Sequence, residues 1–245
     1  MVKVRHLRNA PIVEAIIDFR VRLPSNYDVR KEYFPLIKEL ASKYTKVEKG
    51  TQVKLIEIEG GKPKIQKGGE QKIGGYRLTS RDKKEVVQFR IDGFTYSRLK
   101  PYTKWQLVVE EARRLWDLYK ARSHDLVTER ISVHYINLID IPSNEDLEDY
   151  FTAIPTLPEK LPQALNHFFF NYGFKEKTLQ AMVVQTGVQS PKKDHVGVIL
   201  DIEVFKQNTK GIAEKSAWET ITKMRELKNR IFFEMITNKT VRLYE

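Results

Sequence analysis

The chain has 245 residues, enough for one large domain or two small ones and for a hydrophobic core that needs no covalent cross-link. It contains no cysteine, which excludes a disulfide framework, a thiolate nucleophile and a cysteine-based zinc site, and fits a reducing cytoplasm. A formal net charge of +11 permits binding to phosphates or to an acidic partner, although charges of both signs are interspersed along the chain.

The first predicted element is a strand over Ile12–Leu23, where apolar and charged residues alternate. A period of two is typical of a strand that is buried on one face only. The polar face of this strand carries Glu14, Asp18, Arg20 and Arg22. Because these charges interrupt the apolar residues, the segment is neither a signal sequence nor a membrane span. No other segment comes closer, so we expect a soluble, cytoplasmic protein with no membrane partner.

The rest of the first half predicts a helix, three strands and a second helix, over Asp28–Tyr44, Thr51–Glu59, Tyr76–Arg81, Glu85–Leu99 and Thr103–Arg122. Gly93 predicts a bend within the long third strand, because the apolar alternation shifts there. Thr103 precedes Gln106 by three residues, which is the spacing of a capping box at a helix start.

The second half predicts a similar order of elements. A strand, two short helices, a hairpin and a long helix are expected over Thr128–Ile141, Asp146–Phe151, Leu161–Phe170, Thr178–Val188, His195–Gln207 and Ser216–Met235. Ser216 again precedes an acidic residue, Glu219, by the spacing of a capping box. A short strand is expected at the end of the chain, over Thr240–Tyr244.

Two local matches relate the halves of the sequence. Leu23–Asp28 resembles Ile141–Asp146, and Thr103–Gln106 resembles Ser216–Glu219, at nearly equal offsets along the chain. The alternative is that both are common loop patterns. We predict an α+β fold made of a duplicated β-α-β-β-α unit, with residues 1–125 and 126–245 as the two repeats. The repeats would join into one compact, mainly antiparallel sheet with helices packed on one face.

Three blocks of the sequence carry a resemblance to a known family. They are Asn9–Arg20 (NAPIVEAIIDFR), Asp92–Trp105 (DGFTYSRLKPYTKW) and the end of the last helix, Phe233–Thr237 (FEMIT). Together they resemble a sporadically distributed prokaryotic protein family of unknown function. The patchy distribution of that family resembles that of genes in mobile or defence-related, toxin–antitoxin-like loci. The resemblance implies no catalytic residues.

Motifs for enzyme chemistry are scarce. The sequence has no nucleophile elbow, no phosphate-binding loop and no dinucleotide fingerprint. Its five histidines show no metal-binding spacing, so we expect neither a metal site nor a cofactor. Two carboxylate pairs share strand faces and could converge on a cation, as in a metal-dependent nuclease: Glu14 with Asp18, and Asp201 with Glu203. The alternative is that they pair with Arg20, Arg22 and Arg90 on a solvated sheet face.

Two further features are candidates for function. His134 lies on the polar face of its strand and could act as an acid or base near the carboxylates. Arg98, Lys100 and Lys104 flank Pro101 among aromatic residues, a pattern that can contact phosphates and stack bases. The alternative places these aromatic residues, Trp105 and Trp116 included, in the core.

These observations favour a non-catalytic binding or interaction protein that recognises a protein partner or a second copy of itself. The first alternative is a nucleic-acid-binding module that uses Arg20, Arg22, Arg90, Arg98, Lys100 and Lys104. The second is a metal-dependent hydrolase or nuclease that uses Glu14, Asp18, His134, Asp201 and Glu203.

Overall fold

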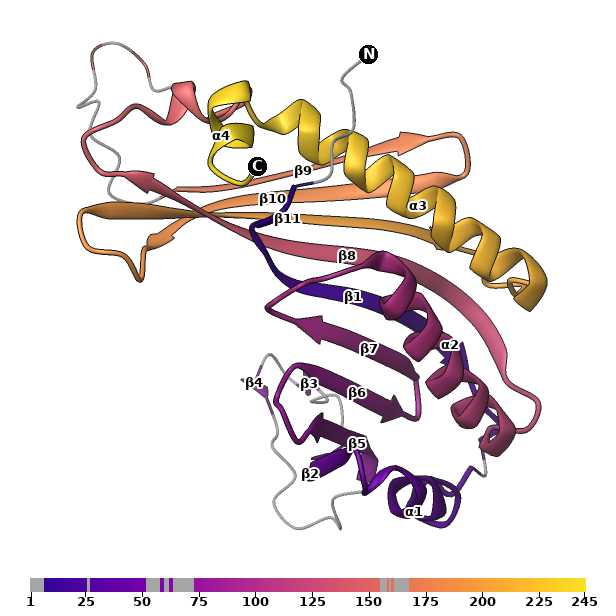
Figure 1. Ribbon diagram of the computed structural model, residues 1–245. Helices are drawn as coiled ribbons and strands as arrows, with labels where there is room; N and C mark the ends of the chain where they lie inside the picture. The colour runs from indigo at the N-terminus through magenta and orange to yellow at the C-terminus, as the bar shows by residue number, and fades with distance from the viewer. Residues whose placement is uncertain are drawn as a thin grey trace.

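The computed structural model describes residues 7–25, 27–51, 58–59, 62–63, 73–154, 158, 160 and 168–245. Nine of its strands form one antiparallel sheet that runs through both halves of the sequence (Figure 1). Across the sheet the order is β2 (Tyr44–Thr51), β5 (Ile73–Ser80), β6 (Glu85–Arg90), β7 (Gly93–Leu99), β1 (Ile12–Arg22), β8 (Val127–Pro142), β11 (His195–Gln207), β10 (Leu179–Gln189) and β9 (Phe169–Glu176). The predicted α+β class and antiparallel sheet are therefore confirmed.

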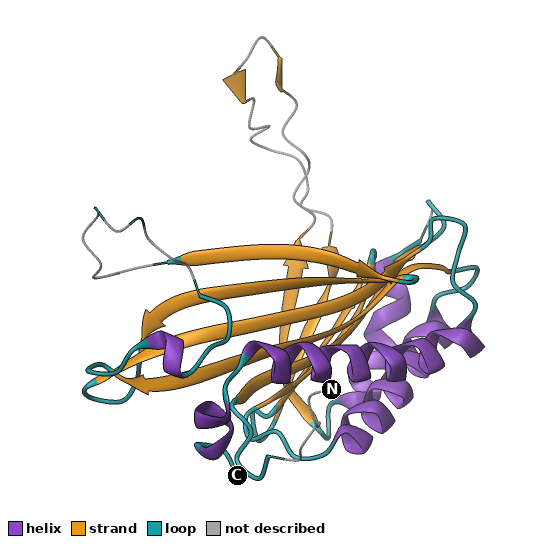
Figure 2. Cartoon of the chain, turned by 90° about the horizontal axis from the view of Figure 1, so that it is seen from above, coloured by secondary structure: helices purple, strands orange, loops and turns teal. Residues whose placement is uncertain are grey.

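The long helices gather on one side of the sheet, as the sequence predicts (Figure 2). These are α1 (Val29–Leu40), α2 (Trp105–Arg122) and α3 (Glu214–Met235). The remaining elements are short: the β3 (Ile58–Glu59) and β4 (Lys62–Pro63) ladder, the 3₁₀ turn η1 (Leu147–Asp149) and the C-terminal helix α4 (Asn238–Arg242). None of the helices in the described part is long and apolar enough to cross a membrane.

The core lies between the sheet and these helices. On β1 the apolar residues that the alternation assigns to one face are buried, and Phe19 is almost completely so. Its ring stacks on Trp116 of α2, with 4.2 Å between ring centroids, and lies 5.3 Å from Trp218 of α3. One side chain of the central strand thus contacts both long helices, and the expectation that Trp116 is a core residue is confirmed.

Several predicted boundaries are wrong, and local contacts explain the differences. Tyr44 begins β2 rather than ending α1, because its ring is fully buried and its hydroxyl donates hydrogen bonds to Glu85 and Glu111. The strand expected over Thr51–Glu59 is described only at its two ends, since residues 52–57 lie outside the described part. In place of the long strand Glu85–Leu99 there are two strands, β6 and β7.

Gly93 explains the division of that strand. Strands β6 and β7 pair as a hairpin, with Arg90 opposite Gly93. A Cβ atom at residue 93 would lie 2.2 Å from the carbonyl oxygen of Phe19, so only glycine lets the turn approach β1 this closely. The predicted bend is therefore a complete reversal of the chain.

The two capping boxes are also wrong. Helix α2 begins at Trp105 behind Lys104, and α3 begins at Glu214 behind Ala213; neither preceding residue forms a side-chain cap. The hydroxyl of Ser216 instead donates to the carbonyl oxygen of Ala213. The matched patterns at the two helix starts therefore do not mark equivalent capping events.

Two segments of the second half differ in type from the prediction. Phe169 and Phe170, expected in a helix, begin strand β9, whereas residues 161–167 of that predicted helix lie outside the described part. The last segment forms helix α4 rather than a strand, because the side chain of Thr237 caps it by accepting from the backbone N–H of Thr240.

We expect Trp116→Ala to lower the free energy of unfolding by about 3–5 kcal/mol, because it opens a cavity beneath Phe19. The indole N–H of Trp116 has no hydrogen-bond partner in the described part of the chain, so the loss is one of packing. Urea denaturation measures the change. The exposed Leu107 of the same helix is the control, and Leu107→Ala should change the stability by less than about 1 kcal/mol. Equal losses for the two variants would contradict the core assignment.

Candidate functional site

The predicted catalytic residues meet on the sheet face that is turned away from the helices. His134 of β8 lies directly opposite Glu203 of β11. In the next row Ile136 of β8 lies opposite both Glu14 of β1 and Asp201 of β11. The sheet-face cluster therefore consists of Glu14, His134, Asp201 and Glu203, drawn from three adjacent strands.

A histidine–carboxylate pair is the centre of this cluster. The Nε2 atom of His134 forms a hydrogen bond with Asp201. Burial lowers the pKa of His134, but the Asp201 hydrogen bond and the charges of Asp201, Glu203 and Glu14 outweigh it, so the pKa is raised. The pair thus favours a charged imidazolium. Among the described residues no group of three or more histidines and acids has an arrangement that could hold a metal ion.

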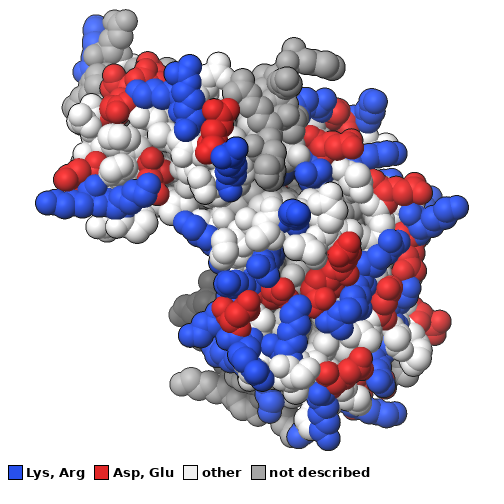
Figure 3. All heavy atoms as spheres, in the orientation of Figure 1, with Lys and Arg blue, Asp and Glu red and all other residues white. Residues whose placement is uncertain are grey.

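Most of the other predicted charged residues form ion pairs. Arg90 lies 3.1 Å from Asp18, whose carboxylate also accepts a 2.7 Å hydrogen bond from Thr95. The other ion pairs are Arg20–Asp92 at 2.9 Å, Arg22–Glu129 at 2.7 Å, Arg98–Glu85 at 2.9 Å and Arg130–Glu203 at 2.9 Å. Figure 3 shows basic and acidic side chains mixed over the face in view. Of the predicted phosphate contacts, only Lys100 and Lys104 are exposed and form no ion pair within the described part of the chain.

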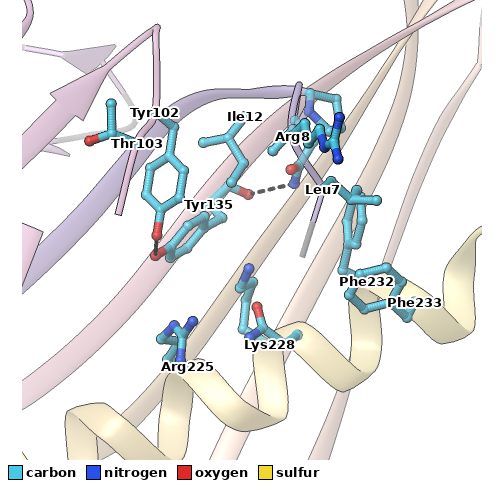
Figure 4. Close-up of a pocket in the computed structure, with 14 residues that line it drawn as sticks. Leu7, Arg8, Ile12, Tyr102, Thr103, Tyr135, Arg225, Lys228, Phe232 and Phe233 are labelled. Atoms are coloured by element: carbon cyan, nitrogen blue, oxygen red, sulfur yellow. Dashed lines mark hydrogen bonds between the residues drawn. The ribbon is translucent and has the colours of Figure 1, made fainter. Parts of the chain in front are cut away.

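A second candidate site lies on the helix side of the sheet, where sequence reasoning placed none. It is a pocket of ≈ 260 Å³ between the segment that leads into β1, the start of α2 and the middle of α3 (Figure 4). Hydrogen bonds from Asn9 N to Tyr244 O, at 3.1 Å, and from Leu138 N to Pro11 O, at 2.9 Å, hold the N-terminal segment over the sheet. The pocket is thus built from segments far apart in the sequence.

Three cations line this pocket, which we call the cationic pocket: Arg8, Arg225 and Lys228. The other lining groups are apolar or neutral, and they include Leu7, Ile12, Tyr102, Tyr135, Asn137, Asn229, Phe232 and Phe233. No aspartate or glutamate is among the described residues that line it. Within that part of the chain, none of the three cations forms an ion pair.

Lys228 is the most unusual of the three. Only 5% of the residue is exposed, and its Nζ atom lies 3.8 Å from the ring centroid of Tyr135 and 6.0 Å from that of Phe232. Burial, and to a smaller degree the charge of Arg225, lowers the pKa of Lys228 to about 7. A buried lysine without a carboxylate partner costs folding free energy, and such groups occur most often at functional sites.

Two tyrosine hydroxyls complete the wall beside Lys228. The hydroxyl groups of Tyr102 and Tyr135 lie 3.2 Å apart and form a hydrogen bond (Figure 4). Burial raises the pKa of both residues, well above the ordinary value for Tyr135, so both hydroxyls are neutral proton donors at physiological pH. The pocket therefore combines cations, neutral donors and apolar walls.

The apolar stripe of helix α3 marks Lys228, although no enzyme motif includes this residue. Ile221, Met224, Ile231 and Met235 are buried on one face of α3 at spacings of three and four residues. Lys228 occupies the position between Met224 and Ile231 in this stripe. A lysine at a core position of an amphipathic helix indicates either a paired charge or a functional one.

Comparison with known proteins gives no further assignment. No protein-family model matches the chain, and no curated protein matches its sequence. The site is therefore interpreted from its geometry alone.

We expect Lys228→Met to stabilise the protein in a pH-dependent way. The unfolded chain binds the lysine proton up to its ordinary pKa of 10.5, whereas the folded chain binds it only up to about 7. Between these values the unfolded state carries more protons, so wild-type stability rises with pH through this window. Lys228→Met should add on the order of a few kcal/mol at pH 6 and much less at pH 10.

Urea denaturation at a series of pH values measures this difference. Lys223→Met, at an exposed position of the same helix, is the matched control and should leave the pH profile unchanged. A stability gain of Lys228→Met that stayed constant from pH 6 to pH 10 would show that Lys228 titrates normally.

Proposed function

We propose that the protein is a cytoplasmic binding protein, and that the cationic pocket is where it holds an anionic ligand. The observation that carries the proposal is the presence of Arg8, Arg225 and Lys228 in one pocket without an acidic residue among its described lining. Cations in proteins are ordinarily neutralised by carboxylates, as Arg90 and Arg130 are on the sheet face of this molecule. An anionic ligand supplies the missing negative charge.

The energetics favour an anion in this pocket. Opposite charges 4 Å apart attract by about 4 kcal/mol at an effective dielectric constant near 20, which is typical of partly buried sites. The apolar walls formed by Leu7, Phe232 and Phe233 limit screening by water. Binding of an anion would also compensate for the desolvation of Lys228.

The size and walls of the pocket define the ligand class. A volume of ≈ 260 Å³ is near the lower end of the range for small-molecule sites. Carboxylate or phosphate oxygens suit the two arginines and Lys228, and a short apolar or aromatic body suits the phenylalanine wall. We therefore propose a small organic anion, or the carboxylate of a protein partner that inserts into the pocket.

The alternative functions are less well supported. Arg20, Arg22, Arg90 and Arg98, proposed as nucleic-acid contacts, all have carboxylate partners, which reduces their availability to phosphates. Of the carboxylates proposed for a hydrolase, Asp18, Asp201 and Glu203 are engaged by Thr95, His134 and Arg130, and the described residues form no metal-binding group.

Titration calorimetry at pH 6.5 with phenylacetate, acetate and inorganic phosphate tests the pocket. Phenylacetate should bind with one site per chain and more tightly than acetate, because its ring contacts the apolar wall. Arg225→Gln should weaken binding by roughly 10- to 100-fold, since a hydrogen bond to a charged group contributes about 1.5–3 kcal/mol. Lys223→Gln, outside the pocket on the same helix, should bind like wild type. If none of the three probes bound at low salt, the proposal would be wrong.

We also infer that the protein self-associates through the edge strand β9. Three aromatic residues are exposed there: Phe169 (65%), Phe170 (39%) and Phe174 (42%). In the described part β9 pairs only with β10, so its outer edge offers free backbone groups. Antiparallel pairing of two copies about Tyr172 places Phe170 of each copy opposite Phe174 of the other, which is the self-complementary pattern of a two-fold interface.

Sedimentation equilibrium measures this association. We expect a dimer for the wild type and a monomer for Phe174→Lys, because a charged side chain opposite Phe170 of the other copy and the lost aromatic contacts oppose the pairing. Phe34→Lys is the matched control, since Phe34 is exposed on α1 far from β9, and it should leave the dimer intact. A wild type that remained monomeric at high concentration would contradict the inference.

Finally, we infer that the two halves of the chain are diverged copies of one unit. The order of the strands outward from the central pair supports this: β1, β7, β6 and β5 on one side, and β8, β11, β10 and β9 on the other. A long helix follows the last strand of each half, α2 after β7 and α3 after β11. An experimental structure in which these strands and helices failed to superpose would overturn the inference.

A further inference from the structure

We propose that Lys228 is a covalent binding site for a 2-oxo acid, whose carbonyl carbon forms an imine with the Nζ atom of the lysine. This proposal rests on the anion site proposed above and identifies the ligand within that class. It concerns a buried nucleophilic group that the rest of the structure leaves without a partner.

The amine of Lys228 is buried beside an aromatic ring. The Nζ atom of Lys228 lies over the ring of Tyr135, at the inner end of a pocket whose mouth carries the exposed residues Arg8 and Thr103. Within the described part of the chain this amine forms no hydrogen bond or ion pair, and no carboxylate lines the pocket beside it. An amine forms an imine only when it is unprotonated, and a desolvated site beside another cation is the standard way to keep a lysine neutral.

No charged group among the described residues that line the pocket favours protonation of Lys228. Arg225, from the preceding turn of α3, is positive and opposes protonation of Lys228. Arg8, from the segment before β1, is also positive, whereas Tyr102 and Tyr135 are neutral. Burial and Arg225 together lower the pKa of Lys228 to about 7, so a large fraction of the amine is neutral at physiological pH.

Arg225 lies beside Lys228 in the pocket and would hold the carboxylate of the ligand. Arg225 and Lys228 lie three residues apart on α3, so they project from the same face of the helix into the pocket (Figure 4). A carboxylate held by Arg225 therefore places an atom bonded to it near Nζ. In a 2-oxo acid that atom is the carbonyl carbon, which makes this class the best match to the pair. The apolar wall of Phe232 and Phe233 accommodates the remaining substituent.

The chemistry balances without an oxidant or reductant. The lone pair of the neutral Nζ attacks the carbonyl carbon, a C–N bond forms, and the carbonyl oxygen takes up a proton. The nitrogen loses a proton to give a carbinolamine, whose hydroxyl group then leaves with a proton as water to form the C=N bond. The hydrogen-bonded hydroxyls of Tyr102 and Tyr135 are placed to supply and return these protons.

Reductive trapping tests the proposal on the full-length chain. The protein is incubated with phenylpyruvate and sodium cyanoborohydride, and intact mass and peptide mapping follow the adduct. We expect one adduct per chain at Lys228 at neutral pH, where exposed lysines stay protonated and react slowly. Modification spread over surface lysines without preference for Lys228 would overturn the proposal.

Two variants separate this proposal from the anion site. Lys228→Arg keeps a cation but cannot form an imine, so it should give no adduct with phenylpyruvate. Lys223→Arg, at an exposed position of the same helix, should still be trapped at Lys228.

Wild-type protein that binds phenylacetate but forms no adduct would refute the imine and leave the anion site standing. Protein that binds neither phenylacetate nor phenylpyruvate would refute both, and thermal melting of each variant confirms that it is folded.

Discussion

The antiparallel pairing of β1 with β8 is the contact on which the rest of the structure depends. It joins the two halves of the sequence at the middle of one sheet and fixes which side chains face the helices. In this register Phe19 is buried beneath both α2 and α3. A shift of the register by one residue would exchange the two faces, exposing Phe19 and burying Arg20, which is now exposed. The same pairing therefore determines the core, the sheet-face cluster and the position of Tyr135 in the cationic pocket.

The two candidate sites differ in how their charges are balanced. On the sheet face, arginines and carboxylates neutralise each other over distances near 3 Å, as in Arg90–Asp18 and Arg130–Glu203, and such pairs are sufficient to explain why these residues are there. In the cationic pocket no such neutralisation occurs among the described residues. Lys228 is nevertheless more buried than Arg90 or Arg130 on the sheet face. A fold that keeps an uncompensated charge in its core is less stable than one with a methionine at that position. The cost is understandable where the charge acts on a ligand.

Much of the fold follows from alternation in the sequence, whereas the pocket does not. Strands β1, β8, β10 and β11 are predicted closely because one face of each is buried, which makes their period of two regular. Strand β9 was missed because its residues are mostly exposed and show no such period. The sheet-face cluster was predicted as a set of residues on polar faces, although their alignment required the strand register. The cationic pocket combines Arg8, Tyr102 and Lys228 from distant segments, and only the apolar stripe of α3 marks one of them.

The positions of the basic residues are more informative about function than the net charge of +11. A basic composition alone suggests a polyanion, since excess charge raises affinity for phosphates without requiring a specific site. In this molecule, however, many of the basic side chains form ion pairs with acidic neighbours, and Figure 3 shows charges of both signs mixed over the face in view. Among the described residues, Lys228 of the cationic pocket is a basic group that forms no ion pair and is also withdrawn from water. Electrostatic attraction is strongest where screening is weakest, so a small concave site with few cations can bind an anion more specifically than a broad surface with many.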